Sequence, residues 1–349
     1  MTVCDRPLVV RCGAFGDMVL LTALIRELHA RWARPVDVVT SGPWSAPLLE
    51  GQPGVGEVYA VRSRKTPYWL APDQHTLVRR LRARGPGPAW FCDANDAARP
   101  LLARAGLAGD LIVDVRDHPL KAGEHATEQW RRFAEATPAC WANRAPPGRF
   151  TGLAGCSLQV GDAARADLDE WLRRRGIADA PLISIQVGNK RTMRRGLRRL
   201  AVNHKYWPNE RWAQVIRGVR ADRPRDAILM LGTGPEFALN AEVAALANVA
   251  GLHNVAADLP IPRLIALLAR SRGLISVDSG PAHAAAAVGC PVVVLFGKAL
   301  PSLYRPWGVA GAPVRVLTGR VDGEPSMLGI EPRAVIDAWR QLGGATGAP

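Results

Sequence analysis

The sequence has little of what marks a membrane-spanning, secreted or metal-binding chain. None of its 349 residues fall in an uninterrupted apolar run of about 18, the length that a spanning helix needs. The first residues, Met1 to Arg6, lack the apolar core of a signal peptide. The six cysteines are scattered and never form a C-x-x-C pair, so they indicate neither a zinc knuckle nor a redox dithiol. We therefore expect a cytoplasmic protein with reduced thiols and no metal site.

Acidic residues are scarce relative to basic ones. Lys and Arg number 45 against 31 Asp and Glu, which gives a net charge of +14. Such a charge predicts attraction to an anionic partner, which could be nucleic acid, phospholipid headgroups or a phosphorylated substrate. The arginine-rich composition of a GC-rich genome would produce the same excess. No RNA-binding or helix-turn-helix signature is present, so we do not expect a nucleic-acid partner.

The chain also has no internal repeat, but it alternates short β-branched runs with helical patterns. This alternation predicts an α/β fold with parallel sheets. The expected strands are residues 8–11, 36–40, 111–115, 182–187, 228–231, 274–277 and 292–296, with a further one near 58–61. Helical periodicity covers residues 18–28, 162–175, 208–220 and 332–342. We expect one domain over residues 1–165, a second over 166–330, and a final helix and tail over 331–349 that could pack on either domain.

The loop after the first strand, Gly13-Ala14-Phe15-Gly16-Asp17, is the first candidate for chemistry, because ligands of parallel sheets bind beyond the carboxyl ends of the strands. It is not the G-x-G-x-x-G fingerprint, and no acidic residue ends the second strand, which argues against a dehydrogenase. Asp17 could simply cap the following helix. It could equally be a general base that takes a proton from an attacking hydroxyl.

Two loops in the second half could hold a nucleotide. Gly232-Thr233-Gly234-Pro235-Glu236 suits a tight turn, and Glu236 could reach the hydroxyls of a ribose. Asp278-Ser279-Gly280-Pro281-Ala282-His283 reads as a helix start, with Ser279 as the capping residue and free N–H groups able to hold a diphosphate. His283 could be a ligand contact or an ordinary packed residue. Lys205, ahead of another helix, could be a solvated charge or neutralise a phosphate.

Taken together, these pieces resemble family 9 glycosyltransferases, the heptosyltransferases that build the inner core of lipopolysaccharide. The matching segments are Gly16-Asp17, Lys205-Tyr206-Trp207-Pro208, Gly234-Pro235-Glu236 and Asp278-Ser279-Gly280 with His283. They occur in the order of the family across residues 7–300. The resemblance implies a GT-B fold, with two Rossmann-like domains facing a cleft, the acceptor bound by the first and the nucleotide-sugar donor by the second.

The resemblance also implies the reaction. Family members invert the anomeric centre, need no essential metal or cofactor, and typically use ADP-L-glycero-D-manno-heptose as donor. The acceptor would be an anionic glycolipid, Kdo-lipid A or one already carrying heptose. By motif, Asp17 would be the general base, Lys205 a phosphate contact and Glu236 a ribose contact beside Gly234. The residues that would line the diphosphate and the sugar are Asp278, Ser279, Gly280 and His283.

Basic residues of the first domain are the expected acceptor contacts. Arg62, Arg64 and Lys65 follow the strand near 58–61 and, with Gly16, would lie at the carboxyl edge of its sheet. Exposed arginines on a solvated face are the alternative. The net charge would also draw the enzyme to the cytoplasmic face of the inner membrane.

Other functions stay open at this point. Ser279 stands where threonine is common in the family, and the arginine-rich residues 191–199 lengthen the loop before Lys205, so the donor could be a different nucleotide-activated sugar. A nucleotide-sugar epimerase would have a similar GT-B shape and need no acceptor. A basic protein that only binds nucleic acid or anionic lipid would show steep salt dependence and no turnover.

Overall fold

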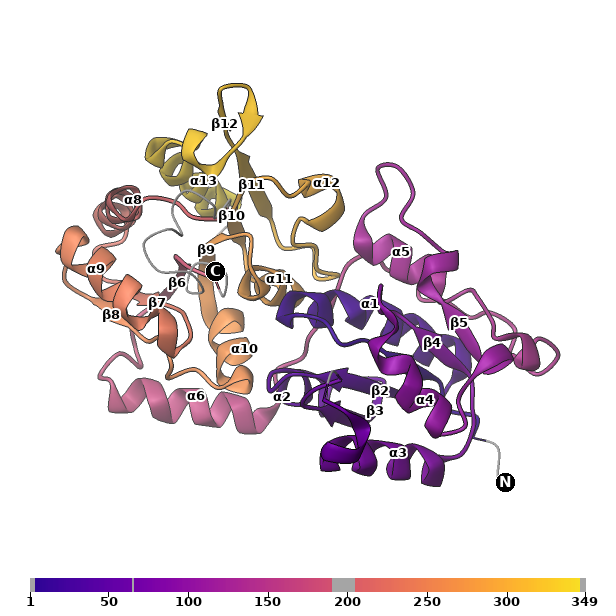
Figure 1. The fold of residues 1–349 in the computed structure, drawn as a ribbon. Coiled ribbons are helices and arrows are strands. Elements are labelled where there is room, and N and C mark those ends of the chain that lie inside the picture. The colour runs from indigo at the N-terminus through magenta and orange to yellow at the C-terminus, as the bar shows by residue number, and fades with distance from the viewer. Residues whose placement is uncertain (1–3, 65, 190–204, 346–349) are drawn as a thin grey trace. The chain divides into compact units, whose positions relative to one another are not determined.

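The computed structural model describes residues 4–64, 66–189 and 205–345. The chain forms two compact units, Met1–Gln159 and Val160–Pro349, each built on its own parallel sheet (Figure 1). No helix within these ranges is both long and apolar enough to cross a membrane.

The sheet of the first unit has five parallel strands in the order β3-β2-β1-β4-β5. The strands are β1 (Leu8–Val10), β2 (Val36–Ser41), β3 (Val55–Val61), β4 (Ala89–Phe91) and β5 (Ile112–Asp114). β1 lies at the centre and is fully buried, as expected for a strand covered on both faces. Sequence periodicity predicts four of the five and misses β4, which has only three residues.

Helices cover both faces of this sheet (Figure 1). They are α1 (Phe15–Trp32), α2 (Ser45–Leu49), α3 (Pro72–Arg84), α4 (Arg99–Arg104) and α5 (Ala126–Phe133). α3 and α4 share a hydrophobic core with β1–β4, which contains Leu77, Leu81 and Leu101. α1 packs instead against α2 and α5. Its apolar side chains Met18, Leu21, Ile25 and Leu28 are all buried, as the helical spacing predicts.

The second unit has a six-stranded parallel sheet in the order β11-β10-β9-β6-β7-β8. The strands are β6 (Leu182–Gln186), β7 (Ala227–Met230), β8 (Leu252–Asn254), β9 (Ser271–Val277), β10 (Val292–Phe296) and β11 (Val314–Thr318). The helices are α6 (Asp162–Arg174), α8 (Asn209–Asp222), α9 (Phe237–Ala247), α10 (Ile261–Arg270), α11 (Gly280–Ala287), α12 (Pro301–Tyr304) and α13 (Pro332–Ala345). A short hairpin joins β12 (Arg320–Val321) and β13 (Glu324–Pro325).

The final helix, α13, belongs to the second unit. It packs against α8, β10 and β11 and buries Val335, Trp339 and Leu342 in the core that these elements share. This answers the question that the sequence leaves open, since the helix could have packed on either domain. Because every ladder of both main sheets is parallel, the loops that follow the strands of one sheet lie at one edge of it. The candidate residues gather at these two edges.

Candidate functional site

Asp17 folds back over the turn between β1 and α1. It is the third residue of α1, and its Oδ2 accepts a hydrogen bond of 2.8 Å from the backbone N–H of Ala14. A side chain at Gly13 would place its Cβ only 2.6 Å from the Cβ of Asp17, so glycine is needed there. The capping interpretation of Asp17 is confirmed. Its side chain is nevertheless 41% exposed, so the carboxylate is accessible to a ligand.

Arg11, at the end of β1, pairs with the other oxygen of Asp17. Its Nη2 lies 3.4 Å from Oδ1 of Asp17, and its Nη1 donates to the carbonyl oxygen of Cys92 at 2.5 Å. The guanidinium therefore joins Asp17 to the end of β4. Both oxygens of the candidate base have a fixed partner.

Asp93 is the centre of this edge of the sheet. It is 3% exposed, and its Oδ1 accepts the N–H of Cys12 at 2.9 Å. Its Oδ2 accepts a hydrogen bond of 3.0 Å from Nη1 of Arg64, and Nη1 of Arg11 lies 4.0 Å from Oδ1. Sequence reasoning missed both Asp93 and Arg11. The available signal was an acidic residue two positions after the short run Ala89–Phe91.

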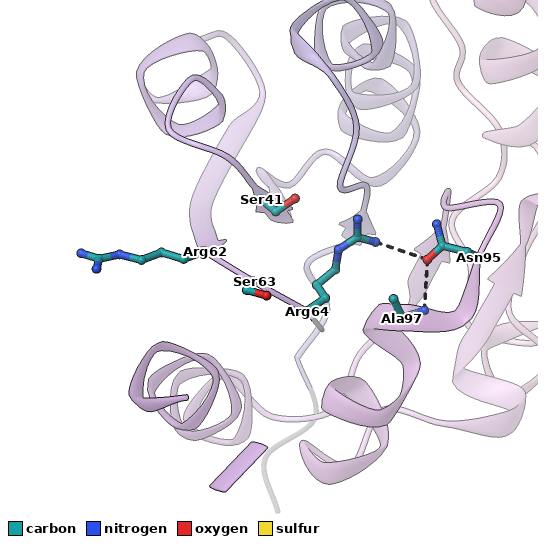
Figure 2. Close-up of a pocket in the computed structure, with 6 residues that line it drawn as sticks. All are labelled: Ser41, Arg62, Ser63, Arg64, Asn95 and Ala97. Carbon is teal, nitrogen blue, oxygen red and sulfur yellow. Dashed lines mark hydrogen bonds between the residues drawn. The ribbon is translucent and has the colours of Figure 1, made fainter. Parts of the chain in front are cut away.

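A pocket of ≈ 600 Å³ opens beside this network, lined by Ser41, Arg62, Ser63, Arg64, Asn95 and Ala97. Figure 2 shows the guanidinium of Arg64 directed to the side chain of Asn95, whose Oδ1 also accepts the N–H of Ala97. The side chain of Arg62 extends away from the other lining residues (Figure 2). Of the expected acceptor contacts, the structure thus brings Arg64 into the pocket and leaves Arg62 at its exposed margin. Gly16 lies in the first turn of α1, and Lys65 lies outside the described residues.

The thiol of Cys12 is not a nucleophile candidate. Burial, reinforced by the carboxylate of Asp93, raises its pKa to about 12. A thiolate is the reactive form of cysteine. Cys12 therefore stays protonated at neutral pH, and the chemistry of this edge belongs to its carboxylates and guanidinium groups.

In the second unit, Lys205 and Asp278 form a close ion pair. Nζ of Lys205 lies 2.5 Å from Oδ2 of Asp278 and donates to the carbonyl oxygen of the same residue at 3.0 Å. Their side chains are 21% and 10% exposed. The structure therefore brings together two candidates that are separated by 73 residues in the sequence. The arginine-rich residues 191–199 lie outside the described part of the chain.

The helix that follows Asp278 begins at Gly280, with Pro281 in its first turn, as expected. Ser279 occupies the N-cap position, but its hydroxyl does not cap the helix; it hydrogen-bonds instead with the hydroxyl of Ser276 at 2.9 Å. The expectation of a side-chain cap from Ser279 is wrong, because a neighbouring serine offers a competing partner. The N–H groups of this first turn are left without that cap. His283 lies further along the same helix and is 6% exposed.

Glu236 is buried and holds the turn after β7. Its Oε2 accepts hydrogen bonds from the N–H and the hydroxyl of Thr233, at 2.8 and 2.7 Å, and its Oε1 accepts one of 3.0 Å from Nε2 of Gln186. Glu236 is only 3% exposed. Gly234 opens this turn. Gln186, which ends β6, was missed by sequence reasoning, although it follows the same rule of strand ends.

One D-x-D sequence, Asp167-Leu168-Asp169, lies in α6. Asp167 accepts hydrogen bonds of 2.7 and 2.8 Å from Arg263, and Asp169 pairs with Arg270 at 2.5 Å. Both carboxylates are thus bound by arginines. Among the described residues, no group of three His, Cys, Asp or Glu side chains could hold a metal ion.

Comparison with known proteins places these residues in a family context. The model of "Glycosyltransferase family 9 (heptosyltransferase)" matches residues 198–319. The chain is 34% identical over 313 residues to lipopolysaccharide heptosyltransferase 3 of Escherichia coli, covering 84% of this chain and 83% of that protein.

Two solved structures share the fold across nearly the whole chain. A family 9 glycosyltransferase from Veillonella parvula has a TM-score of 0.77 at 19% identity and covers 97% of this chain and 96% of its own. The ADP-heptose lipopolysaccharide heptosyltransferase II of Escherichia coli has a TM-score of 0.71 at 20% identity, covering 97% and 98%. With the two parallel sheets, this likeness confirms the expected GT-B fold.

Proposed function

Because the chain belongs to glycosyltransferase family 9, the heptosyltransferases, we propose that it transfers heptose from ADP-L-glycero-D-manno-heptose to an inner-core acceptor of lipopolysaccharide, with inversion. The observation that carries this proposal is the 34% identity to a lipopolysaccharide heptosyltransferase over 83% of that protein. The chemistry of the two sheet edges supports it. One edge offers a carboxylate and arginines, and the other offers an ammonium and a helix N-terminus.

Asp17 is the general base in this proposal. A sugar hydroxyl is a poor nucleophile, so a carboxylate must take its proton as the new glycosidic bond forms. The exposed carboxylate of Asp17 is fixed by Arg11 and by the N–H of Ala14. Such fixing lowers the cost of orienting the base against the acceptor.

The second unit binds the donor and stabilises the departing ADP. Negative charge grows on the diphosphate as the bond to the heptose breaks, and electrostatic stabilisation of such charge is usually the largest catalytic contribution. Lys205 supplies an ammonium, and the first turn of α11 supplies the N–H of Gly280, since Pro281 has none and the N–H of Ala282 donates to the carbonyl oxygen of Ser279. Asp278 orients Lys205, and His283 lines the sugar side. Glu236 and Gly234 contact the ribose.

The first unit binds the acceptor. Kdo sugars carry carboxylates, and lipid A carries phosphates, which guanidinium groups bind well. Arg64 provides one inside the pocket, which the polar residues Ser41, Ser63 and Asn95 also line. Arg62 contributes at its margin, and Gly16 and Lys65 are proposed as further acceptor contacts from their place in the sequence. The reaction takes place at the cytoplasmic face of the inner membrane and requires no cofactor besides the donor.

Release of nucleotide diphosphate, measured with a panel of donors, tests the proposal. Wild-type protein mixed with ADP-heptose should release ADP only when Kdo-lipid A or a heptosylated acceptor is present, in equal amounts with the glycosylated product. Addition of EDTA should leave the rate unchanged. If only a UDP- or GDP-sugar, and no ADP-sugar, released nucleotide diphosphate in the presence of acceptor, the proposed donor would be wrong. The assignment to the family would still hold. Conversion of UDP-GlcNAc without acceptor would identify an epimerase instead.

A further inference from the structure

A tryptophan and a leucine stand out in solvent on the loop that leads from the acceptor pocket. Trp69 is 75% exposed and Leu70 is 55% exposed. Both lie on the 3₁₀ turn η1 (Tyr68–Leu70), a few residues after the pocket-lining Arg62, Ser63 and Arg64. Neither is used by the proposed reaction.

The turn is firmly built. Gln74, which is 2% exposed, donates through Nε2 to the carbonyl oxygens of Ser63 and Thr66 at 2.7 and 2.9 Å. The ring of Tyr68 packs on His75 with centroids 4.2 Å apart. The neighbouring aromatic residue thus faces inward, and the turn holds Trp69 and Leu70 outward.

Two exposed arginines, Arg62 and Arg104, contact residues that lie close to Trp69 and Leu70 along the chain. The backbone N–H of Arg62 donates to Asp73 at 2.8 Å, which ties this exposed arginine to the start of α3. The guanidinium carbon of Arg104 lies 4.7 Å from the centroid of the Tyr68 ring, and Arg104 is also exposed. α3 begins two residues after Leu70, but its four arginines lie in its second half, where Arg80 pairs with Glu57 and Arg84 is buried against Asp37, so they are not counted as part of this surface.

We propose that Trp69 and Leu70, flanked by Arg62 and Arg104, form a docking surface for an anionic lipid bilayer. Tryptophan and leucine insert at the boundary between headgroups and acyl chains, and arginines bind anionic headgroups beside them. A stable protein interface buries about 800 Å² on each partner, which two side chains cannot supply. A small apolar group with arginines beside it is suited to binding a bilayer better than to binding another protein.

This inference rests on the proposed function, because a membrane-embedded glycolipid acceptor explains why the surface lies next to the pocket. Docking through Trp69 and Leu70 holds the loop that carries Arg64 at the membrane. The sugar headgroup of a lipid in that membrane then meets the pocket without leaving the bilayer. Docking should therefore matter for a lipid-anchored acceptor and not for a free one.

Co-sedimentation with lipid vesicles tests the surface directly. Wild-type protein should bind vesicles of phosphatidylglycerol and phosphatidylcholine and bind pure phosphatidylcholine weakly. The double variant Trp69→Ser/Leu70→Ser should bind the anionic vesicles at least roughly tenfold more weakly, because binding no longer transfers two apolar side chains from water into the bilayer. Leu70→Ser alone should also weaken binding to these vesicles. The matched control is Leu300→Ser, at a leucine that is 59% exposed in the second unit, and it should leave vesicle binding unchanged.

Transfer assays on two acceptors complete the test. The double variant should lose transfer to Kdo-lipid A embedded in anionic vesicles and keep the wild-type rate on an acyl-free, water-soluble core acceptor. Vesicle binding equal to that of wild type would overturn the docking surface. The proposal would also be overturned if wild type sedimented as a dimer and the double variant as a monomer. A second copy of the chain, and not a bilayer, would then cover Trp69 and Leu70. Absence of transfer by wild type on either acceptor would instead overturn the proposed function, since vesicle binding is measured without turnover.

Discussion

At the scale of single residues, Asp93 holds the acceptor edge together. A buried carboxylate is costly unless it is paired and hydrogen-bonded. Asp93 meets both conditions through Arg64 and the N–H of Cys12, with Arg11 4.0 Å away. Arg11 in turn contacts Asp17. The buried carboxylate of Asp93 therefore positions Arg64 in the pocket. It also lies close to Arg11, which pairs with the proposed base Asp17.

Replacing Asp93 by asparagine should weaken acceptor binding. The amide side chain keeps the volume and can still accept the N–H of Cys12, but it lacks the charge that holds Arg64. We expect KM for the acceptor to rise by roughly tenfold or more, the usual loss for a hydrogen bond to a charged group, while KM for the donor stays unchanged. Steady-state kinetics with each substrate varied in turn measures both.

The matched control for that change is Asp96→Asn, at a carboxylate 59% exposed that follows the same strand. It should leave both KM values close to wild type. If Asp93→Asn lowered only the yield of folded protein, with both KM values unchanged, Asp93 would be structural and not a positioning residue.

The sequence locates some of these residues and not others for a physical reason. Asp17, Glu236 and Asp278 each follow an apolar strand, so the rule of strand ends finds them without a structure. Arg11 and Asp93 acquire a role only through the pairing of Val10 with Phe91 across β1 and β4. That register joins segments 81 residues apart, so although both residues follow short apolar runs, the sequence alone does not show that they meet. The competing bond of Ser279 with Ser276 is likewise a tertiary detail.

At the scale of elements, ion pairs and hydrogen bonds of charged side chains hold α6 against α10 and the loop before it. Arg263 forms two hydrogen bonds with Asp167, and Asp258 accepts one of 2.8 Å from Nε1 of Trp171. The guanidinium of Arg263 also lies over the ring of Trp171, 5.6 Å from its centroid. These contacts hold the first helix of the second unit against the rest of it.

Arg263→Gln should therefore lower the free energy of unfolding by about 1–2 kcal/mol, since bonds to a partly exposed carboxylate contribute modestly. Hydrogen bonds from Arg263 hold the pKa of Asp167 below its usual range. This contribution is present above the unfolded pKa, about 3.9, and is lost as pH falls through the lower folded value. Urea denaturation at neutral and acid pH should show the difference between the two proteins shrink with acid.

Arg333→Gln is the control for that experiment, because the Arg333 side chain is 93% exposed and pairs with Asp337 only at 3.8 Å. It should leave unfolding unchanged at every pH. An equally small effect of Arg263→Gln would show that apolar packing alone holds α6.

Strands differ in how well the sequence predicts them. The apolar runs of β6, β7, β9 and β10 are buried on both faces, so composition reveals them. β4 and β8 have three residues each, and β8 contains His253 and Asn254, so no periodicity develops. β11 alternates Val314, Arg315 and Val316 at an edge of the sheet. β4, β8 and β11 are therefore recognised as strands only from their pairing with adjacent strands in the structure.

At the scale of the whole molecule, the net charge of +14 fits a protein whose proposed donor, acceptor and membrane surface are all anionic. The charge alone would fit nucleic acid as well. The family and the placement of the charges favour the sugar transfer, because arginines and a lysine accompany carboxylates at strand ends. The two sites can be tested independently, since donor and acceptor residues belong to different units.

The rate of ADP release from ADP-heptose and Kdo-lipid A, compared between wild type and Asp17→Asn, tests the account most directly. The amide oxygen of the variant can still accept the N–H of Ala14, so the fold should persist, but an amide cannot take a proton. We predict that kcat falls by about a hundredfold or more while the Kd for ADP stays the same. The control Asp162→Asn, at an acid in the first turn of α6, should keep the wild-type rate. Near wild-type release by Asp17→Asn would contradict the account.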